Sequence, residues 1–192
     1  MRIFVVGTGR CGTRTFSQAC KRISNFTSGH ETHARRLLGN LDYPDNHIEV
    51  DHHLGWALPM LLEKYPPGPD AYYVHLVRER SACVASLARR HDMDYFAALC
   101  CFVECSRRTP DVRRRAAEYY YDMRNASIAG ALRSAQAGAF SARVEIENLP
   151  SAWHGFWDMI GARGDLVAAL VECSKRYNRG LESKGEKVRD EH

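Results

Sequence analysis

A short apolar segment that runs directly into a glycine-rich turn opens the sequence, MRIFVVGTGRCGTRTF. Residues Ile3–Val6 are β-branched or aromatic, which predicts a buried strand. The three glycines within residues 7–12 let the backbone turn sharply and approach a ligand without an intervening Cβ atom. Thr13 then opens a predicted helix, whose free N–H groups and dipole favour an anion at its start. This segment therefore predicts a site for phosphate or a similar anion.

The position of the positive charge separates this turn from the common nucleoside-triphosphate loop, GxxxxGK[ST]. Gly7 and Gly12 have the spacing of that loop, but Thr13 stands where its lysine would reach the β- and γ-phosphates. Arg10 supplies a cation two residues before Gly12 instead. The run Arg-Cys-Gly-Thr-Arg-Thr resembles the 5′-phosphosulfate loop of sulfotransferases, in which a Lys or Arg, a small residue, Gly and Thr follow one another. Taken alone, the turn would also fit an ordinary connection between a strand and a helix.

The resemblance implies an enzyme that uses 3′-phosphoadenosine 5′-phosphosulfate (PAPS) as its sulfuryl donor. It further implies that the loop holds the 5′-phosphosulfate, through Gly9, Arg10, Cys11, Gly12, Thr13, Arg14 and Thr15. In the transfer step, Arg10 would neutralise the charge that grows on the leaving phosphate.

A second element with a specific spacing follows the predicted strand Ala71–Val77. Arg78 stands at the carboxyl end of this strand, where open α/β sheets bind ligands, and Ser86 follows eight residues later on a predicted helix. Sulfotransferases hold the 3′-phosphate of PAPS with an Arg and a Ser at this separation, and HLVRERSACVAS is similar to that element. Where the family usually reads Arg-Asp-Pro, this chain reads Arg78-Glu79-Arg80. Without the resemblance, Arg78 could equally cap a helix or pair with Glu79.

The segment between these elements offers candidates for a catalytic base. Glu31 lies 21 residues after Arg10 and follows a predicted strand, Asn25–Ser28. The stretch Gly-His-Glu-Thr is similar to the Gly-Glu-Glu-Thr of protein-tyrosine sulfotransferases, whose second glutamate is the proposed base, and this implies Glu31. His30 is a rival, because imidazole titrates near neutrality whereas a carboxylate must be desolvated or hydrogen-bonded to act there. Glu31 fits equally well as a carboxylate at a helix N-terminus.

A third polar group, Asp51-His52-His53, follows the predicted strand His47–Val50 and heads a predicted helix, Leu54–Lys64. Acid and imidazole side chains at a strand end suit either a substrate contact or a metal site. Since no His-Glu-x-x-His, Cys-x-x-Cys or repeated carboxylate pattern accompanies them, we expect no metal centre. Asp51 fits an N-cap, and Asp51 and His52 are secondary candidates for the acceptor pocket.

Predicted strands and helices alternate along the first half of the chain, and this alternation then stops. Two predicted helices, Tyr95–Arg107 and Asp111–Gly130, follow one another without a strand between them. The last predicted strand, Arg143–Ile146, leads into VEIENL, which resembles a sulfotransferase segment where a strand ends in an acidic residue and Leu. Helices are predicted after it over Trp153–Ile160 and Leu166–Arg176.

The expected fold class is α/β, a P-loop NTPase-like three-layer α/β/α arrangement. Its central sheet is mainly parallel with about five strands, and extra helices cover it. Residues 1–181 are expected to form a single domain, because 192 residues suffice for one sizeable core. Residues 182–192 are charged with few apolar side chains and are predicted to be a disordered tail.

Composition excludes several classes of function. The net charge is only +4, with arginines scattered over several predicted helices, so an anionic cofactor accounts for it and we expect no nucleic-acid partner. Seven cysteines, an odd number, favour reduced thiols in a cytoplasmic compartment. No apolar run is long enough for a secretory signal or a membrane span, so no membrane association is expected.

The matched segments stand in the order of the sulfotransferase family and span most of the chain. They imply transfer of the sulfuryl group of PAPS to a hydroxyl or amine of a small-molecule, carbohydrate or peptide acceptor, without a metal. Two alternatives stay open. A P-loop phosphotransferase would need a lysine at position 13 and a carboxylate for magnesium, and a non-catalytic nucleotide-binding module would keep the fold without turnover. The sequence indicates neither the acceptor nor the oligomeric state.

Overall fold

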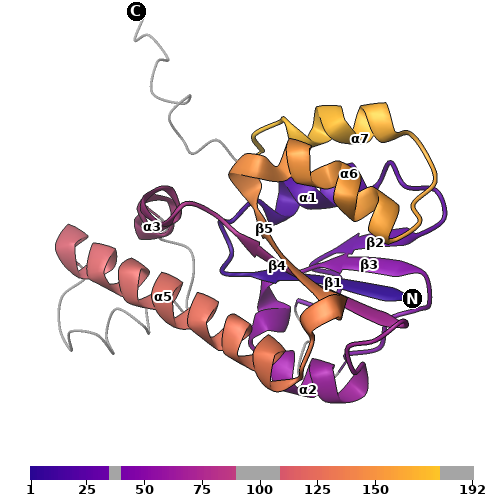
Figure 1. The fold of residues 1–192 in the computed structure, drawn as a ribbon. Coiled ribbons are helices and arrows are strands. Elements are labelled where there is room, and N and C mark those ends of the chain that lie inside the picture. Colours follow the sequence, from indigo (N-terminus) through magenta and orange to yellow (C-terminus); the bar gives the residue numbers. More distant parts are fainter. Residues whose placement is uncertain (35–39, 90–108, 178–192) are drawn as a thin grey trace, which may run out of the picture.

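The central sheet places β1 in its middle. A computed structural model describes residues 1–34, 40–89 and 109–177 of the protein. In these residues five parallel strands form one sheet in the order β2-β3-β1-β4-β5 (Figure 1). The strands are β1 (Arg2–Gly7), β2 (Thr27–His30), β3 (His47–Val50), β4 (Ala71–Val77) and β5 (Ser141–Glu145).

Helices cover both faces of this sheet (Figure 1). In the described residues they are α1 (Thr13–Cys20), α2 (Leu58–Lys64), α3 (Arg80–Ala88), α5 (Pro110–Ser134), α6 (Leu149–Met159) and α7 (Leu166–Cys173). Short 3-10 helices are η2 (His52–Gly55), η3 (Gly138–Phe140) and η4 (Ile146–Asn148).

The side chains of β1 alternate between two cores. Ile3 and Val5 pack with α1, α6 and α7 on one face of the sheet. Phe4 and Val6 pack with α2 and α5 on the other face. Successive side chains of a strand point to opposite faces, so an all-apolar strand must be covered on both sides. The predicted three-layer α/β/α fold with a parallel sheet is thus confirmed.

A third, smaller core joins α3 to α5. Cys83, Val84 and Leu87 of α3 pack against the first half of α5, including Ala116 and Tyr120. The hydroxyl of Tyr120 donates to the carbonyl oxygen of residue 8 over 2.9 Å. This contact ties the α3–α5 pair to the loop that follows β1.

Element boundaries differ from the predicted ones where tertiary pairing sets them. β3 and β4 have their predicted bounds, whereas β2 begins at Thr27 rather than Asn25. Its register is set by pairing with β3, since Thr27 lies opposite His47. The predicted helix Leu54–Lys64 is divided into η2 and α2, because Pro59 lies in the first turn of α2 and starts a new helix.

Part of the sequence-based assignment falls outside the described residues. The predicted helix Tyr95–Arg107 and the predicted tail, residues 182–192, lie there. The assignment of residues 1–181 to a single domain therefore stays a prediction. No helix within the described ranges has the length and apolar character to cross a bilayer.

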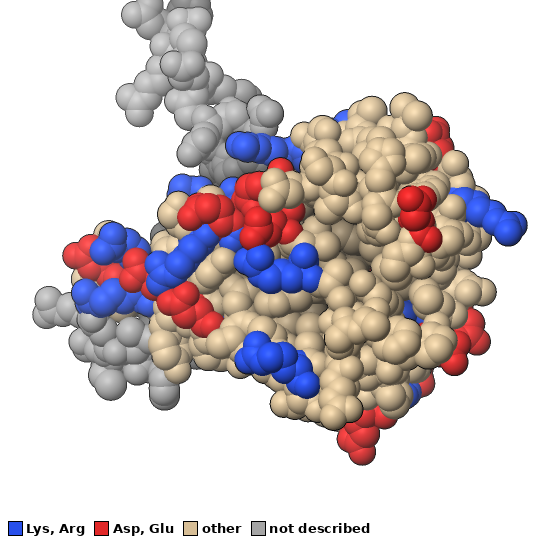
Figure 2. Space-filling view, in the orientation of Figure 1, with Lys and Arg blue, Asp and Glu red and all other residues tan. Residues whose placement is uncertain are grey.

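Charges of both signs are interspersed on the surface. Figure 2 shows Lys and Arg next to Asp and Glu over α3 and α5. Arg80 and Asp122 form an exposed bidentate pair there, with distances of 2.9 and 2.7 Å. Arg114 and Glu118 form a second pair one helical turn apart, at 3.7 Å. Such mixed surface charges largely offset one another within the face shown.

Candidate active site

The polar residues of interest gather at one edge of the sheet, because the parallel strands end there together. The N–H of Glu31 donates to the last carbonyl oxygen of β3 over 3.3 Å. The N–H of Asp51 donates to a carbonyl oxygen of β1 over 3.0 Å. The loop of residues 8–12 and Arg78 follow β1 and β4 at the same edge. The strand ends thus bring all the sequence-predicted segments to one place.

The loop between β1 and α1 depends on glycine at two positions. Gly9 and Gly12 have φ angles of 75° and 95°, in the left-handed region that favours glycine. A Cβ atom on Gly12 would collide with the side chain of Ile146. Gly12 is the N-cap of α1, and no side chain in the described part of the chain caps this helix. A glycine at this position leaves the start of α1 without a side-chain cap, and such helix starts favour an anion.

Arg10 connects the loop to the second predicted element. Its backbone has a φ of 55°, and its Nε donates to Ser86 Oγ over 3.0 Å. Arg78 Nη1 donates to the carbonyl oxygen of Arg10 over 3.2 Å. The spacing predicted Ser86 beside Arg78, whereas the structure places the Ser86 hydroxyl against the side chain of Arg10. The structure thus joins Arg10, Arg78 and Ser86 in one group of polar contacts.

The departure from the Arg-Asp-Pro pattern has a local explanation. Glu79 caps α3 by accepting hydrogen bonds from the N–H groups of Ser81 and Ala82, at 2.7 and 2.8 Å. Hydrogen bonds from Ser81 also lower the pKa of Glu79. Arg80 points away from the loop toward Asp122. Glu79 therefore acts as the helix cap, and Arg78 contacts the phosphate-type loop.

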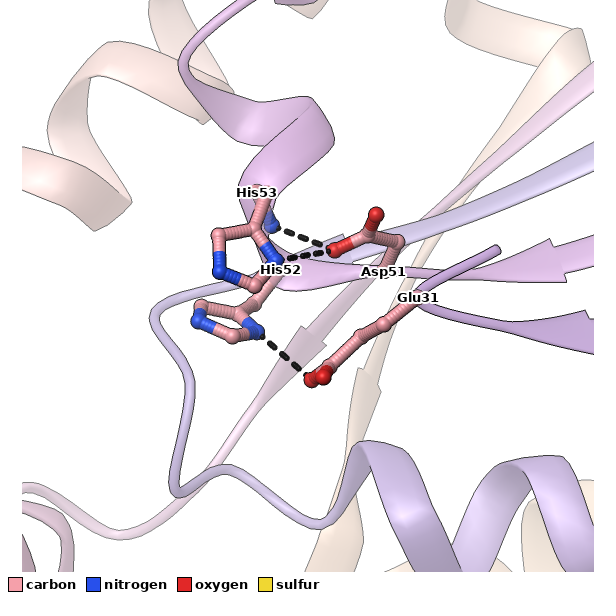
Figure 3. A group of neighbouring side chains, drawn as sticks. All are labelled: Glu31, Asp51, His52 and His53. Carbon is pink, nitrogen blue, oxygen red and sulfur yellow. Dashed lines mark hydrogen bonds and ion pairs between the residues drawn. The ribbon is translucent and has the colours of Figure 1, made fainter. Parts of the chain in front are cut away.

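Glu31 and three residues after β3 form two hydrogen-bonded pairs (Figure 3). Glu31 Oε1 accepts from His52 Nδ1 over 3.1 Å. Asp51 Oδ1 accepts from both the N–H and the Nδ1 of His53, over 2.7 and 2.8 Å. The interpretation of Asp51 as an N-cap is thus confirmed for η2. Glu31 has a φ of 57°, so its backbone too is held in the left-handed region.

These pairs shift the ionisation of their members. The hydrogen bond from His52 lowers the pKa of Glu31 to about 2, against the opposing effect of burial. The hydrogen bond to Asp51 raises the pKa of His53. Glu31 is therefore fully ionised at neutral pH, and its carboxylate accepts a charge-assisted hydrogen bond from His52.

The tautomer of His52 follows from its partner. A carboxylate only accepts hydrogen bonds, so His52 Nδ1 carries a proton, and in the corresponding neutral tautomer the lone pair is on Nε2. The ring lies against the loop: a Cβ atom on Gly9 would come within 2.9 Å of His52 Cδ2 and within 3.3 Å of His52 Nε2. A proton-accepting nitrogen is thus placed beside the predicted phosphosulfate loop. The Glu31–His52 pair is absent from the sequence-based prediction; its only signal is that both residues follow strands.

His30 belongs to the same site but has a different neighbour. Its Nε2 lies 3.4 Å from Thr13 Oγ1, at the start of α1. Burial lowers the pKa of His30, so the ring is neutral near pH 7. The structure therefore brings His30 to the loop, next to Glu31 at 3.9 Å.

Three of the predicted loop residues direct their side chains elsewhere. The side chain of Cys11 is fully buried among the residues under α1, and burial raises the pKa of its thiol. Thr15 Oγ1 donates to the carbonyl oxygen of Lys175 over 3.1 Å. The guanidinium of Arg14 lies 5.9 Å from the ring centre of Tyr177. Cys11 and Thr15 thus offer the loop their backbone rather than their side chains.

The four residues of Figure 3 also include the possible metal ligands of the site. One donor atom from each of Glu31, Asp51, His52 and His53 lies within 4.8 Å of the others. The expectation of no metal centre rested on sequence spacing, which does not show that Glu31 joins the residues after β3. The structure does not test that expectation.

Comparison with known proteins supports the fold assignment. No protein-family model matches the sequence, and no curated protein matches it. Among solved structures, the chain is similar to mouse sulfotransferase SULT7A1 in a crystal structure complexed with PAP, with a TM-score of 0.52 and 11% sequence identity. The similarity covers 90% of this chain and 62% of the mouse chain, so this protein spans less than two thirds of that relative. The five-stranded parallel sheet, with its glycine loop after β1, thus has the fold of a sulfotransferase.

Proposed function

We propose that this protein is a PAPS-dependent sulfotransferase that transfers a sulfuryl group to a hydroxyl or amine. The observation that carries the proposal is the hydrogen bond of 3.0 Å between Arg10 and Ser86. It joins the loop that resembles a phosphosulfate site to the element that resembles a 3′-phosphate site. A nucleotide with phosphates at both its 5′ and 3′ positions needs both elements within the span of one ribose. The sulfotransferase fold and the PAP bound to the mouse structure agree with this assignment.

The residues present suit the anionic groups of PAPS. Gly9 and Gly12 allow the left-handed turn of the loop, and Gly12 has no side chain that could cap the start of α1 in place of an anion. Arg10 and Arg78 add two guanidinium groups, which match phosphate oxygens well. When bound, PAPS would supply the activated sulfuryl group. Backbone N–H groups of the loop would hold its 5′ side, and Arg78 with Ser86 would hold its 3′-phosphate.

Within the chain, the Glu31–His52 pair is suited to take the acceptor proton. Glu31 holds the His52 ring so that the edge with Cδ2 and Nε2 lies beside the loop, and the carboxylate would stabilise the imidazolium that forms when Nε2 takes a proton. Glu31 thereby contributes through His52. His30, whose ring lies next to Thr13 at the start of α1, is the alternative residue to accept the proton. Asp51 accepts a hydrogen bond from His53 Nδ1 and so fixes the ring of His53 next to this pair.

Charge stabilisation would come from the loop itself. Arg10 is held by Ser86, and its own carbonyl oxygen is held by Arg78, so the guanidinium needs little reorganisation as negative charge develops nearby. The cations that a phosphotransferase takes from lysine and magnesium are thus supplied by arginines.

The cysteines in the described residues are unpaired and buried, which supports a cytoplasmic location.

The test is transfer of label from [35S]PAPS to a panel of phenols, sugars, amines and peptides, with ATP and Mg²⁺ assayed in parallel. We expect labelled product from at least one acceptor class and no phosphoryl transfer from ATP. His52→Asn should abolish the transfer, and His154→Asn, at an exposed histidine of α6, is the matched control. Phosphoryl transfer from ATP would contradict the proposal. Tight PAPS binding without transfer to any acceptor would instead favour a non-catalytic module.

A further inference from the structure

We propose that Glu31, Asp51, His52 and His53 form a binding site for a divalent transition-metal ion of the zinc class. The side chains come from the ends of β2 and β3 and from η2, and they converge as Figure 3 shows. Each offers one donor atom, and these atoms all lie within 4.8 Å of one another.

The distances between the donor atoms are close to those around a bound ion. Ligand atoms of a tetrahedral zinc site lie about 3.3 Å apart, given metal–ligand distances near 2.0 Å. His52 Nδ1 and Glu31 Oε1 are 3.1 Å apart, and His53 Nδ1 and Asp51 Oδ1 are 2.8 Å apart. The widest separation would have to close by about 1.5 Å at most. Rotation of the Glu31 side chain, which is 32% exposed, can supply this movement.

The donor set selects the class of ion. Two imidazole nitrogens and two carboxylate oxygens suit Zn²⁺, Co²⁺ and similar ions, whereas Mg²⁺ prefers oxygen ligands and keeps several waters. Each histidine now donates its Nδ1 proton to a carboxylate, so binding requires that proton to leave Nδ1, for Nε2 or for solvent. Asp51 is fully buried and the other three side chains are partly exposed, so an ion can reach the site from solvent.

The site has a consequence for turnover that rests on the proposed function. Metal binding through His52 Nδ1 would break the hydrogen bond to Glu31 and leave the proton on Nε2. The nitrogen beside the loop would then be unable to accept a proton. Zn²⁺ would therefore inhibit transfer and would not take part in it.

Binding is measured without any acceptor, so its outcome is independent of the proposed function. We would titrate the 192-residue protein with Zn²⁺ by calorimetry and with Co²⁺ by visible ligand-field absorption, with Mg²⁺ for comparison. We expect one equivalent of Zn²⁺ or Co²⁺, an absorption of the intensity typical of four-coordinate Co²⁺, and no competition by Mg²⁺. Glu31→Gln and His53→Gln should each weaken binding at least about 10-fold.

The matched control is His47→Gln. His47 also pairs with a buried carboxylate, Glu49, at 3.2 Å, but it lies outside the cluster. This variant should bind Zn²⁺ like the unmodified protein, and thermal unfolding would confirm that each variant is folded. Equal Zn²⁺ affinity in Glu31→Gln, His53→Gln and the unmodified protein would overturn the proposal, as would an absence of binding or a preference for Mg²⁺.

Discussion

Glu31 and His52, which follow the neighbouring strands β2 and β3, share a hydrogen bond of 3.1 Å, and the edge of the histidine ring that carries Cδ2 and Nε2 lies against the loop after β1. The pair depends on the sheet, because parallel pairing of β2 with β3 places the ends of the two strands side by side. It converts a carboxylate of low pKa, which is a weak base by itself, into a group that positions an imidazole.

The Glu31–His52 pair predicts which single substitutions stop turnover. Glu31→Gln keeps the size of the side chain but loses the negative charge, so it should lower turnover at saturating PAPS by about 10²–10⁴-fold while cofactor affinity stays unchanged. His52→Asn should lose as much. His30→Asn should be mild. Turnover of all three variants across pH 5 to 9 is the measurement, with an acceptor from the screen described above.

The same series distinguishes the rival bases. A His30→Asn variant without activity, beside an active His52→Asn variant, would transfer the role to His30. An inactive Glu31→Gln variant beside an active His52→Asn variant would make Glu31 itself the base. Active variants at all three positions would remove this edge of the sheet from the proton-transfer step.

Arg10→Ala should affect turnover more than cofactor binding. The guanidinium lies at the loop where negative charge is expected to grow, so its loss removes stabilisation that is largest in the transition state. Steady-state kinetics with PAPS, together with calorimetry of the bound product nucleotide, separates the two effects. Ser86→Ala, which removes the partner of Arg10 and the proposed contact to the 3′-phosphate but keeps the guanidinium, serves as the comparison and should lower cofactor affinity. An effect of Arg10→Ala confined to cofactor affinity would make Arg10 a binding residue only.

Gly12→Ala should destabilise the protein by about 1–3 kcal/mol, because the left-handed backbone resists a side chain and a Cβ atom would collide with Ile146. Gly155→Ala is the matched control, since Gly155 lies within α6 and nothing lies within 4 Å of its added Cβ atom. That change should raise stability by about 0.5–1 kcal/mol. Urea unfolding of both variants checks the prediction, and equal effects would show that the loop does not require glycine at position 12.

Glu172 should make stability depend on pH in the acid range. Hydrogen bonds from Tyr177, Arg22 and Lys175 lower its pKa to about 2. The folded state therefore releases this proton more readily than the unfolded state, whose glutamate has a pKa near 4.5. The stabilisation is present above pH 4.5 and is lost as the pH falls toward 2.

Glu172→Gln should flatten the dependence of the unfolding free energy on pH in this window. The control is Glu63→Gln, at an exposed position of α2, which should retain the dependence of the unmodified protein. Urea unfolding at several pH values between 2.5 and 6 provides the comparison. An unchanged slope in Glu172→Gln would show that other carboxylates account for the acid sensitivity.

The fold could be predicted from sequence because its signals are local. The all-apolar strand Ile3–Val6, the glycines after it and the strand Ala71–Val77 specify buried parallel strands and a phosphate-type loop by themselves. The predicted range of β2 was less accurate. Its sequence, Thr-Ser-Gly-His, has weak strand propensity, and its bounds come from pairing with β3.

The internal connections of the site could not be predicted, because they join residues far apart in the chain. Arg10 and Ser86 are 76 positions apart, and Glu31 and His52 are 21 positions apart. Sequence spacing indicated that Arg78 and Ser86 belong together, yet it does not give the rotation of α3 relative to the loop. For the same reason, sequence spacing could not predict that Glu31 lies close to Asp51 and the two histidines.

The most direct measurement of the central claim is calorimetric titration with adenosine 3′,5′-bisphosphate and with adenosine 5′-monophosphate. The nucleotides differ only in the 3′-phosphate, which Arg78 and Ser86 are proposed to hold. A lost charge-assisted contact costs about 1.5–3 kcal/mol, so the bisphosphate should bind one to two orders of magnitude more tightly, and Arg78→Ala should remove the difference. Equal affinities of the unmodified protein for the two nucleotides would contradict the account.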